Sequence, residues 1–248
     1  MYALILAGGQ GTRLWPRSRQ DRPKQLLDIA SSSTMLQETY ARVAPLMPPD
    51  HVYVVTNAVC ETEVCRQLID VPSENVIVEP SGKNTAPAVG LGSLYIRRRD
   101  PEATVAVLSA DHVIRRTDEF VMVLRAAESI AQQGYLVTIG IKPTRPETGY
   151  GYIEVGPELA TYFGHSTHAV ARFTEKPDAA TAQRFLAGGK HLWNAGMFVW
   201  RVDRVLQAIS THLPDLSQAL AEIEADLGTP QASATLQRVW RGVQPVSI

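Results

Sequence analysis

The chain has 248 residues, 45% of them hydrophobic and 20% charged, which predicts a folded protein of one large α/β domain or two small ones. The formal net charge of −1 argues against the broad positive surface that nucleic-acid binding needs. Only Cys60 and Cys65 could pair or bind zinc, and their spacing favours neither. Without a basic leader or a long apolar run, we expect no membrane attachment and a reducing, cytoplasmic setting.

Short apolar runs alternate with helical patterns through the first part of the chain, and this rhythm is typical of a parallel sheet. The expected strands are 3–6, 51–56, 75–78, 104–108 and 135–139. The expected helices are 34–44, a segment through Val64 and Leu68, 85–98 and 117–132. Thr34 and Gln37 have the spacing of a capping box at the start of the first helix.

After Lys142, closely spaced prolines and glycines break this rhythm. We expect strands at 152–155, 168–173 and 196–200, and helices at about 178–187 and from Val202 onward. We interpret residues 1–248 as a single domain, in which 142–248 extend a nucleotide-binding half of residues 1–141 with a mixed sheet.

A glycine-rich loop follows the first strand, at the carboxyl end where open α/β sheets bind ligands. Glycines let the backbone turn tightly and direct its N–H groups toward a phosphate. Leu14 stands where a dinucleotide fingerprint has its third glycine, and no P-loop ending is present. The loop instead carries Arg13, with Lys24 close behind, and these two cations together with a divalent metal could neutralise a nucleoside triphosphate.

These residues belong to an ordered set of motifs that resembles the sugar-1-phosphate nucleotidylyltransferase family, and in particular its bacterial mannose-1-phosphate guanylyltransferase branch. The motifs are Leu6–Pro16 with Ser18-Arg19 and Pro23-Lys24-Gln25, Glu79-Pro80, Asn84–Ala88, Ser109–His112, Glu147–Ile153, Phe173–Pro177 and Trp193–Phe198. The resemblance implies a Rossmann-like three-layer sandwich with a predominantly parallel, mixed central sheet.

The resemblance also implies roles for the nucleotide-binding residues. The loop residues expected at the nucleotide are Ala7, Gly8, Gly9, Gly11 and Thr12, joined by Ser109. Asp111 is expected to bind Mg²⁺, since hard cations prefer oxygen ligands, whereas His112 has an orienting or packing role. Glu79 is the candidate acceptor for the N1–H and N2–H groups of guanine. Asn84 and Thr85 either line the base or cap the following helix.

The sugar phosphate is expected to contact the second half of the chain. Gly149 lies in a run of small residues that brings backbone close to the sugar, and Glu175 can accept hydrogen bonds from two adjacent hydroxyls. Lys176 can hold the sugar phosphate as a point charge, and Asn194 can both donate to and accept from hydroxyls. Without the resemblance, the Glu175-Lys176 pair would be interpreted as an exposed strand end.

The implied reaction joins GTP and mannose 1-phosphate to give GDP-mannose and diphosphate, with Arg13 at the leaving diphosphate and Lys24 near the α-phosphate. The family's second metal carboxylate lies in an Asp-Tyr-Gly segment expected after Ile248, so the chain is expected to be truncated. Alternatives are UTP or dTTP with glucose 1-phosphate, and a non-catalytic sugar-nucleotide sensor. A dinucleotide-dependent oxidoreductase is disfavoured by Leu14 and Arg13. A homo-oligomer is possible.

Overall fold

A computed structural model describes residues 1–9, 15–19, 23–29 and 31–248. Within them, eight strands form one sheet in the order β3-β2-β1-β4-β8-β6-β7, and β5 pairs with β8. The strands are β1 (Tyr2–Leu6), β2 (Val52–Asn57), β3 (Val76–Glu79), β4 (Thr104–Ser109), β5 (Val137–Ile141), β6 (Tyr152–Tyr162), β7 (His165–Thr174) and β8 (His191–Arg201). The α-helices are α1 (Met35–Val43), α2 (Glu61–Gln67), α3 (Thr85–Arg99), α4 (Thr117–Ala131), α5 (Ala179–Gly188), α6 (Val202–His212), α7 (Pro214–Asp226) and α8 (Ala232–Trp240).

The sheet is mixed, with most of its strands running in one sense. β1 pairs in parallel with β2 and β4, and β2 pairs in parallel with β3. β8 is antiparallel to β4, β5 and β6, so β5 and β6 share the direction of β4, and β7 is antiparallel to β6. The predicted α/β class with a predominantly parallel, mixed sheet is confirmed.

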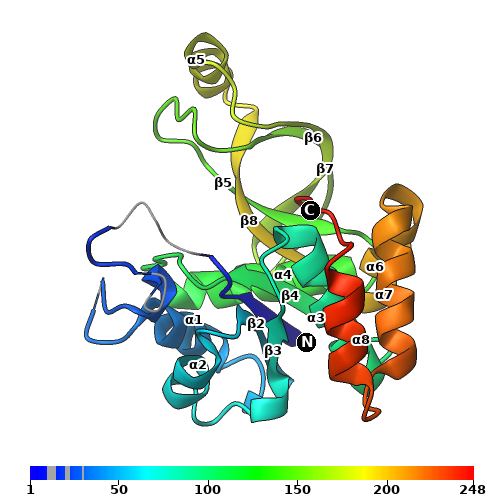
Figure 1. Cartoon of the computed structure of the whole chain (residues 1–248). Coiled ribbons are helices and arrows are strands. Elements are labelled where there is room, and N and C mark those ends of the chain that lie inside the picture. The colour runs from blue at the N-terminus through cyan, green and yellow to red at the C-terminus, as the bar shows by residue number, and fades with distance from the viewer. Residues whose placement is uncertain (10–14, 20–22, 30) are drawn as a thin grey trace.

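Helices cover both faces of the sheet because alternate side chains of each strand point to opposite faces. Leu4 of β1 belongs to a core that includes residues of α3, α6, α7 and α8. Ala3 and Ile5 belong to a second core with residues of α1, α2 and α4. Figure 1 shows α6, α7 and α8 together on one side and α1 and α2 on the other, with the β6–β7 hairpin and α5 projecting away. The chain is therefore a three-layer sandwich.

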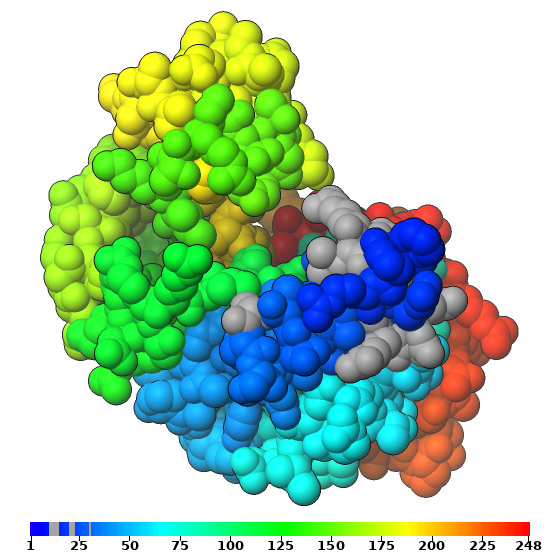
Figure 2. Space-filling view, turned by 90° about the vertical axis from the view of Figure 1, so that its left-hand side faces the viewer, coloured from blue at the N-terminus to red at the C-terminus, as the bar shows by residue number. Residues whose placement is uncertain are grey.

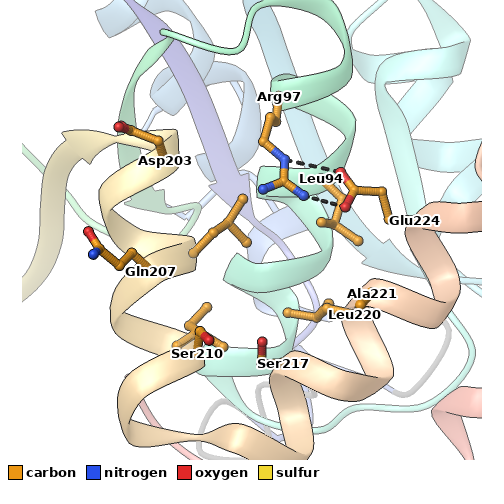
Figure 3. Close-up of a pocket in the computed structure, with 11 residues that line it drawn as sticks. Leu94, Arg97, Asp203, Gln207, Ser210, Ser217, Leu220, Ala221 and Glu224 are labelled. Atoms are coloured by element: carbon orange, nitrogen blue, oxygen red, sulfur yellow. Dashed lines mark hydrogen bonds and ion pairs between the residues drawn. The ribbon is translucent and has the colours of Figure 1, made fainter.

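α3 is the most deeply buried helix of the first core because small residues along it admit neighbouring side chains. A Cβ on Gly92 would lie 2.4 Å from a methyl carbon of Leu4, and one on Gly90 would lie 2.6 Å from a methyl carbon of Leu220. Arg97, in its last turn, is paired with Glu224 of α7. A cavity of about 340 Å³ lies beside this ion pair, between α3, α6 and α7 (Figure 3). None of the predicted site residues that the structure describes lines it. The described residues contain no helix with the length and apolar composition that crossing a bilayer requires.

The largest differences from the predicted elements lie in the second half of the chain. β6 extends seven residues beyond the expected 152–155, and β7 begins three residues before and ends one residue after the expected 168–173. None of these added residues is buried. Their pairing register shifts between Val155 and Glu158, where Gly156 and Pro157 lie, so these residues mark an irregularity inside the hairpin and do not end the strand. β5 begins and ends two residues later than the expected 135–139. β8 begins five residues before the expected 196–200. The remaining expected elements agree with the structure to within a few residues at each end.

Candidate nucleotide and sugar-phosphate site

The backbone that leaves β1 is held in place by a buried glutamine. Ala7 donates its N–H to the Val55 carbonyl of β2 over 2.8 Å. Gln25, which is 2% exposed, donates its amide to the carbonyl of Ala7 over 2.6 Å and to that of Gly9 over 3.1 Å. Gln25 belongs to a short 3-10 helix, Lys24–Leu26, so these bonds fix Lys24 beside the glycine turn. The predicted site residues Gly11, Thr12 and Arg13 lie outside the described residues.

Lys24 and Asp111, predicted to act on the phosphates and the metal, are in direct contact. The Lys24 ammonium forms an ion pair with the Asp111 carboxylate, which also accepts a hydrogen bond from the Ser109 hydroxyl. Burial raises the pKa of the Asp111 carboxyl, but the bonds from Lys24 and Ser109 outweigh it and leave this pKa below its usual value. Asp111 is therefore ionised and has a cation against it at the carboxyl end of β4.

An arginine from α1 supports the Asp111 loop. Arg42, which is 6% exposed, donates to the carbonyl of His112 over 2.8 Å and to the hydroxyl of Thr39 over 2.7 Å. Burial lowers the pKa of the His112 imidazole, so a neutral ring is favoured. The orienting or packing role expected for His112 stays a prediction. Sequence reasoning missed both Arg42 and Gln25; for Gln25 the signal was its place in Pro23-Lys24-Gln25, whereas nothing local marks Arg42.

Glu79 ends β3 as a buried carboxyl that faces the glycine turn. It is 4% exposed, and its Oε2 atom has no hydrogen-bond partner among the described residues. Burial raises its pKa from 4.5 to about 7, although the backbone N–H of Lys83 acts in the opposite direction. A Cβ on Gly8 would lie 2.6 Å from Glu79 Oε1, so a larger residue there would displace the carboxyl from its present position. An unsatisfied buried carboxyl of this kind suits a ligand that brings hydrogen-bond donors.

The loop between β3 and α3 leads from Glu79 to the start of the helix. Asn84 is the N-cap of α3, and its side chain accepts a hydrogen bond from the Thr85 N–H over 2.8 Å. The capping alternative for Asn84 is therefore confirmed. Asn84 has φ of 71° and ψ of −168°, backbone angles that are almost confined to glycine, so this non-glycine residue is held in a strained conformation. Both Asn84 and Thr85 also line a cavity, so capping does not remove them from the candidate site.

That cavity, of about 840 Å³, brings together most of the described nucleotide-site residues. Its lining includes Gly8, Gly9, Glu79, Asn84, Thr85 and Ser109, together with Pro23, His112, Ala195 and Gly196. Lys24 and Asp111 do not line this cavity, but Pro23, Ser109 and His112, which are close to them in the sequence, do. Figure 2 shows the molecule hollowed between the projecting part that carries α5 and the N-terminal segment in blue. The volume is within the range of small-molecule sites.

The predicted sugar-phosphate residues form a second cluster at β6, β7 and β8. A Cβ on Gly151 would lie 2.7 Å from Glu175 Oε2 and 3.5 Å from the Asn194 Cβ, so these three residues are adjacent. Asn194 Oδ1 accepts from the Gly196 N–H over 3.0 Å, and Gly196 also lines the cavity. The exposed Lys176 Nζ lies 2.9 Å from Glu175 Oε1. Asn194 thus connects the two groups of predicted residues.

Gly149 lies in the same part of the molecule but uses its backbone N–H within its own loop. It donates to Glu147 Oε1 over 3.1 Å, and Arg145 pairs with the same carboxylate at 3.1 Å. Neither Gly149 nor the Glu175-Lys176 pair lines the large cavity as the described residues define it. Gly149, Glu175 and Lys176 therefore lie outside the cavity that the predicted nucleotide residues line.

Glycines, a lysine and two acidic residues at the carboxyl ends of parallel strands define an α/β protein suited to binding phosphorylated ligands. The chain belongs to the nucleotidyl transferase family, whose model matches residues 2–243. It is 43% identical to mannose-1-phosphate guanylyltransferase of Klebsiella pneumoniae over 221 residues, 88% of this chain and 46% of that protein. It is also 43% identical to the xanthan biosynthesis protein XanB of Xanthomonas campestris over 218 residues, 87% of this chain and 45% of that protein.

Solved structures agree with this assignment. A crystal structure described as mannose-1-phosphate geranyltransferase from Thermus thermophilus superposes with a TM-score of 0.86 at 34% identity, covering 100% of this chain and 69% of that one. The chain spans less than half the length of the curated relatives described above. The predicted family is confirmed.

Proposed function

We propose that this chain carries the guanylyltransferase activity that joins GTP and mannose 1-phosphate to give GDP-mannose and diphosphate. The observation that carries the proposal is the 840 Å³ cavity, where a glycine turn, a buried unsatisfied carboxyl and the start of α3 meet beside the Lys24–Asp111 pair. Relatives that carry the name mannose-1-phosphate guanylyltransferase support the choice of substrates.

Glu79 is the group we assign to base selection. Its Oε2 atom lacks a partner among the described residues, and guanine presents adjacent N1–H and N2–H donors that a carboxylate can accept together. Adenine and cytosine have a ring-nitrogen acceptor at the corresponding position, so at most one oxygen of the buried carboxylate would find a donor, on the neighbouring amine. Uracil and thymine present only one donor there. These differences favour GTP over the alternative of UTP or dTTP.

Nucleotidyltransferases of this family generally use a divalent metal, and the residues at Asp111 fit one that takes most of its ligands from phosphates and water. Asp111 is ionised and already has a cation, the Lys24 ammonium, against its carboxylate. No group of three or more His, Cys, Asp or Glu side chains among the described residues is placed to form a complete metal cage. We assign Asp111 as a ligand of Mg²⁺, which supplies charge neutralisation at the triphosphate.

The reaction we propose needs no general base because the attacking sugar-phosphate oxygen is already an anion. A bond forms between that oxygen and the α-phosphorus of GTP, and the bond from this phosphorus to the bridging oxygen breaks, so diphosphate leaves with that electron pair. A divalent metal held by Asp111 would supply charge neutralisation at the triphosphate, and the Lys24 ammonium, which contacts the Asp111 carboxylate, is assigned to the α-phosphate. Arg13, from the glycine loop, is assigned to the leaving diphosphate.

At the other end of the site, Glu175 and Asn194 are assigned to the sugar hydroxyls and Lys176 to the sugar phosphate. Gly151 allows the first two side chains to approach each other, since a Cβ there would lie 2.7 Å from Glu175 Oε2. Lys176 follows on the same strand end and has its ammonium 2.9 Å from Glu175. This arrangement offers acceptors for hydroxyls and one positive charge for a monoester phosphate.

Diphosphate release, measured with each of four NTPs against mannose 1-phosphate and glucose 1-phosphate, tests this proposal. We expect turnover with GTP and mannose 1-phosphate to exceed every other pair. Faster turnover with UTP or dTTP and glucose 1-phosphate would contradict the proposal and identify that pair as the substrates. Mg²⁺-dependent binding of GTP or GDP-mannose by calorimetry, without turnover, would favour the sugar-nucleotide sensor.

A further inference from the structure

The stretch from the end of α8 to Ile248 contacts the loop between β3 and α3. Trp240, the last residue of α8, has no exposed surface, and its indole N–H donates to the carbonyl of Ser81 over 2.8 Å. Val243, 4% exposed, joins the same core cluster as Trp240. One end of the loop is therefore fixed to the first core by a partly buried hydrogen bond, although the two segments are far apart in the sequence.

The residues after Val243 bind the other end of the loop through their backbone. Val246 donates its N–H to the Lys83 carbonyl over 3.2 Å, and its own carbonyl accepts from the Ala86 N–H over 3.1 Å. The Ile248 N–H donates to the Thr85 hydroxyl over 2.9 Å. Ala86 lies in the first turn of α3, where backbone N–H groups lack acceptors inside the helix. The Val246 carbonyl supplies the missing acceptor for the Ala86 N–H.

The loop held in this way is also a wall of the nucleotide cavity. Ser81, Asn84 and Thr85 line it, and the Lys83 N–H acts on the Glu79 carboxyl. Lys83 is thus held from both sides, with its carbonyl on Val246 and its N–H toward Glu79. A change in the position of the C-terminal stretch would move both the cavity wall and the partner of the buried carboxyl.

We propose that residues 240–248, here called the C-terminal clamp, set the geometry in which the 81–85 loop and Glu79 select the nucleotide base. Trp240 and Val246 are then positioning residues for base specificity, which they control without touching the nucleotide. This inference rests on the proposed base selection by Glu79. It goes beyond that proposal because it assigns specificity to a segment remote in sequence from every predicted site residue.

Trp240→Phe is the sharpest test because it removes the indole N–H and retains an aromatic ring in the core. Trp200→Phe is the matched control: Trp200 is 3% exposed, belongs to the same core cluster, and its indole nitrogen has no partner among the described residues. Both variants lose a similar volume of buried ring, but only the first loses a bond to the loop. Affinities for GTP and ATP, both with Mg²⁺, would be measured by calorimetry, and amide exchange would be followed without nucleotide.

We expect Trp240→Phe to weaken GTP binding roughly three- to ten-fold, the usual effect of one neutral hydrogen bond, and to weaken ATP binding less. Amides 82–86 should exchange faster in this variant than in wild type, even without nucleotide. Trp200→Phe should keep the wild-type ratio of GTP to ATP affinity and the wild-type exchange of these amides, whatever its melting temperature.

Unchanged exchange and an unchanged affinity ratio in Trp240→Phe, or equal changes in both variants, would overturn the clamp. If instead the proposed base selection by Glu79 is wrong, the wild-type protein itself shows no preference for GTP over ATP. Amide exchange in Trp240→Phe still tests the clamp in that case. Should Trp240→Phe not fold, Val246→Pro removes the N–H donated to Lys83, leaves Trp240 in the core, and carries the same expectations.

Discussion

Replacing Glu79 with glutamine removes the ionisable group of the nucleotide cavity while keeping its size. Glu79 is 4% exposed, and burial raises the pKa of its carboxyl to about 7. The neutral amide has no charge to desolvate, so the variant should fold without the cost that the ionised carboxylate imposes. The same change takes away the acceptor pair proposed for guanine. Glu79→Gln should therefore be more stable than wild type at high pH and bind GTP more weakly.

The size of the stability effect follows from the pKa difference between folded and unfolded protein. A shift from 4.5 to about 7 corresponds to about 3 kcal/mol, at about 1.4 kcal/mol for each pKa unit. Because the pKa of Glu79 is raised in the folded protein, the protonated carboxyl adds to the free energy of unfolding. This contribution is fully present below pH 4.5 and is lost as the pH rises through about 7. The difference in unfolding free energy between Glu79→Gln and wild type should therefore increase by about 3 kcal/mol across this window.

Urea unfolding of the nucleotide-free protein at several pH values between 5 and 8.5 measures this difference. Glu74→Gln is the matched control, since Glu74 is exposed just before the same strand. We expect the control to follow wild type at every pH. Parallel pH profiles for wild type and Glu79→Gln would refute the reasoning, because they would show that the buried carboxyl ionises as it does in the unfolded chain.

GTP binding supplies an independent measurement on the same residue. If the ionised form of Glu79 accepts the guanine donors, wild-type affinity for GTP should rise roughly ten-fold between pH 6 and pH 8, following the ionised fraction of a group with a pKa of about 7. ATP carries the same phosphates, so its pH dependence corrects for their titration. Glu79→Gln should lose the rise that is specific to GTP.

Three further variants test separate parts of the site. Arg13→Ala should lower turnover by roughly a hundred-fold or more with little change in melting temperature, and wild-type diphosphate release would contradict its assigned role. Gly8→Ala places a Cβ 2.6 Å from Glu79 Oε1 and should raise the KM for GTP while leaving that for the sugar phosphate unchanged. Gly151→Ala places a Cβ 2.7 Å from Glu175 Oε2 and should do the reverse; equal effects on both KM values would argue against separate nucleotide and sugar ends.

The candidate site was predictable from the sequence to the extent that each motif follows a strand. Glu79 ends β3 and Ser109 ends β4, and the glycine turn leaves β1, so parallel neighbours had to bring these segments to one edge of the sheet. The motif Pro23-Lys24-Gln25 marks Gln25 as part of the site, whereas nothing local marks Arg42. The bonds that these two residues make were not predictable, because their partners are backbone carbonyls that only the folded chain brings within reach.

By itself, the sequence determined the class of elements and their order, because apolar periodicity and helix capping are local properties. The capping box at Thr34 and the cap at Asn84 are examples, and both are present in the structure. Only the tertiary structure decided that Lys24 meets Asp111, that the Glu79 carboxyl is buried against Gly8, and that Val246 binds Lys83. These contacts depend on how whole elements pack, and the pKa of a carboxyl depends on the solvent that this packing excludes.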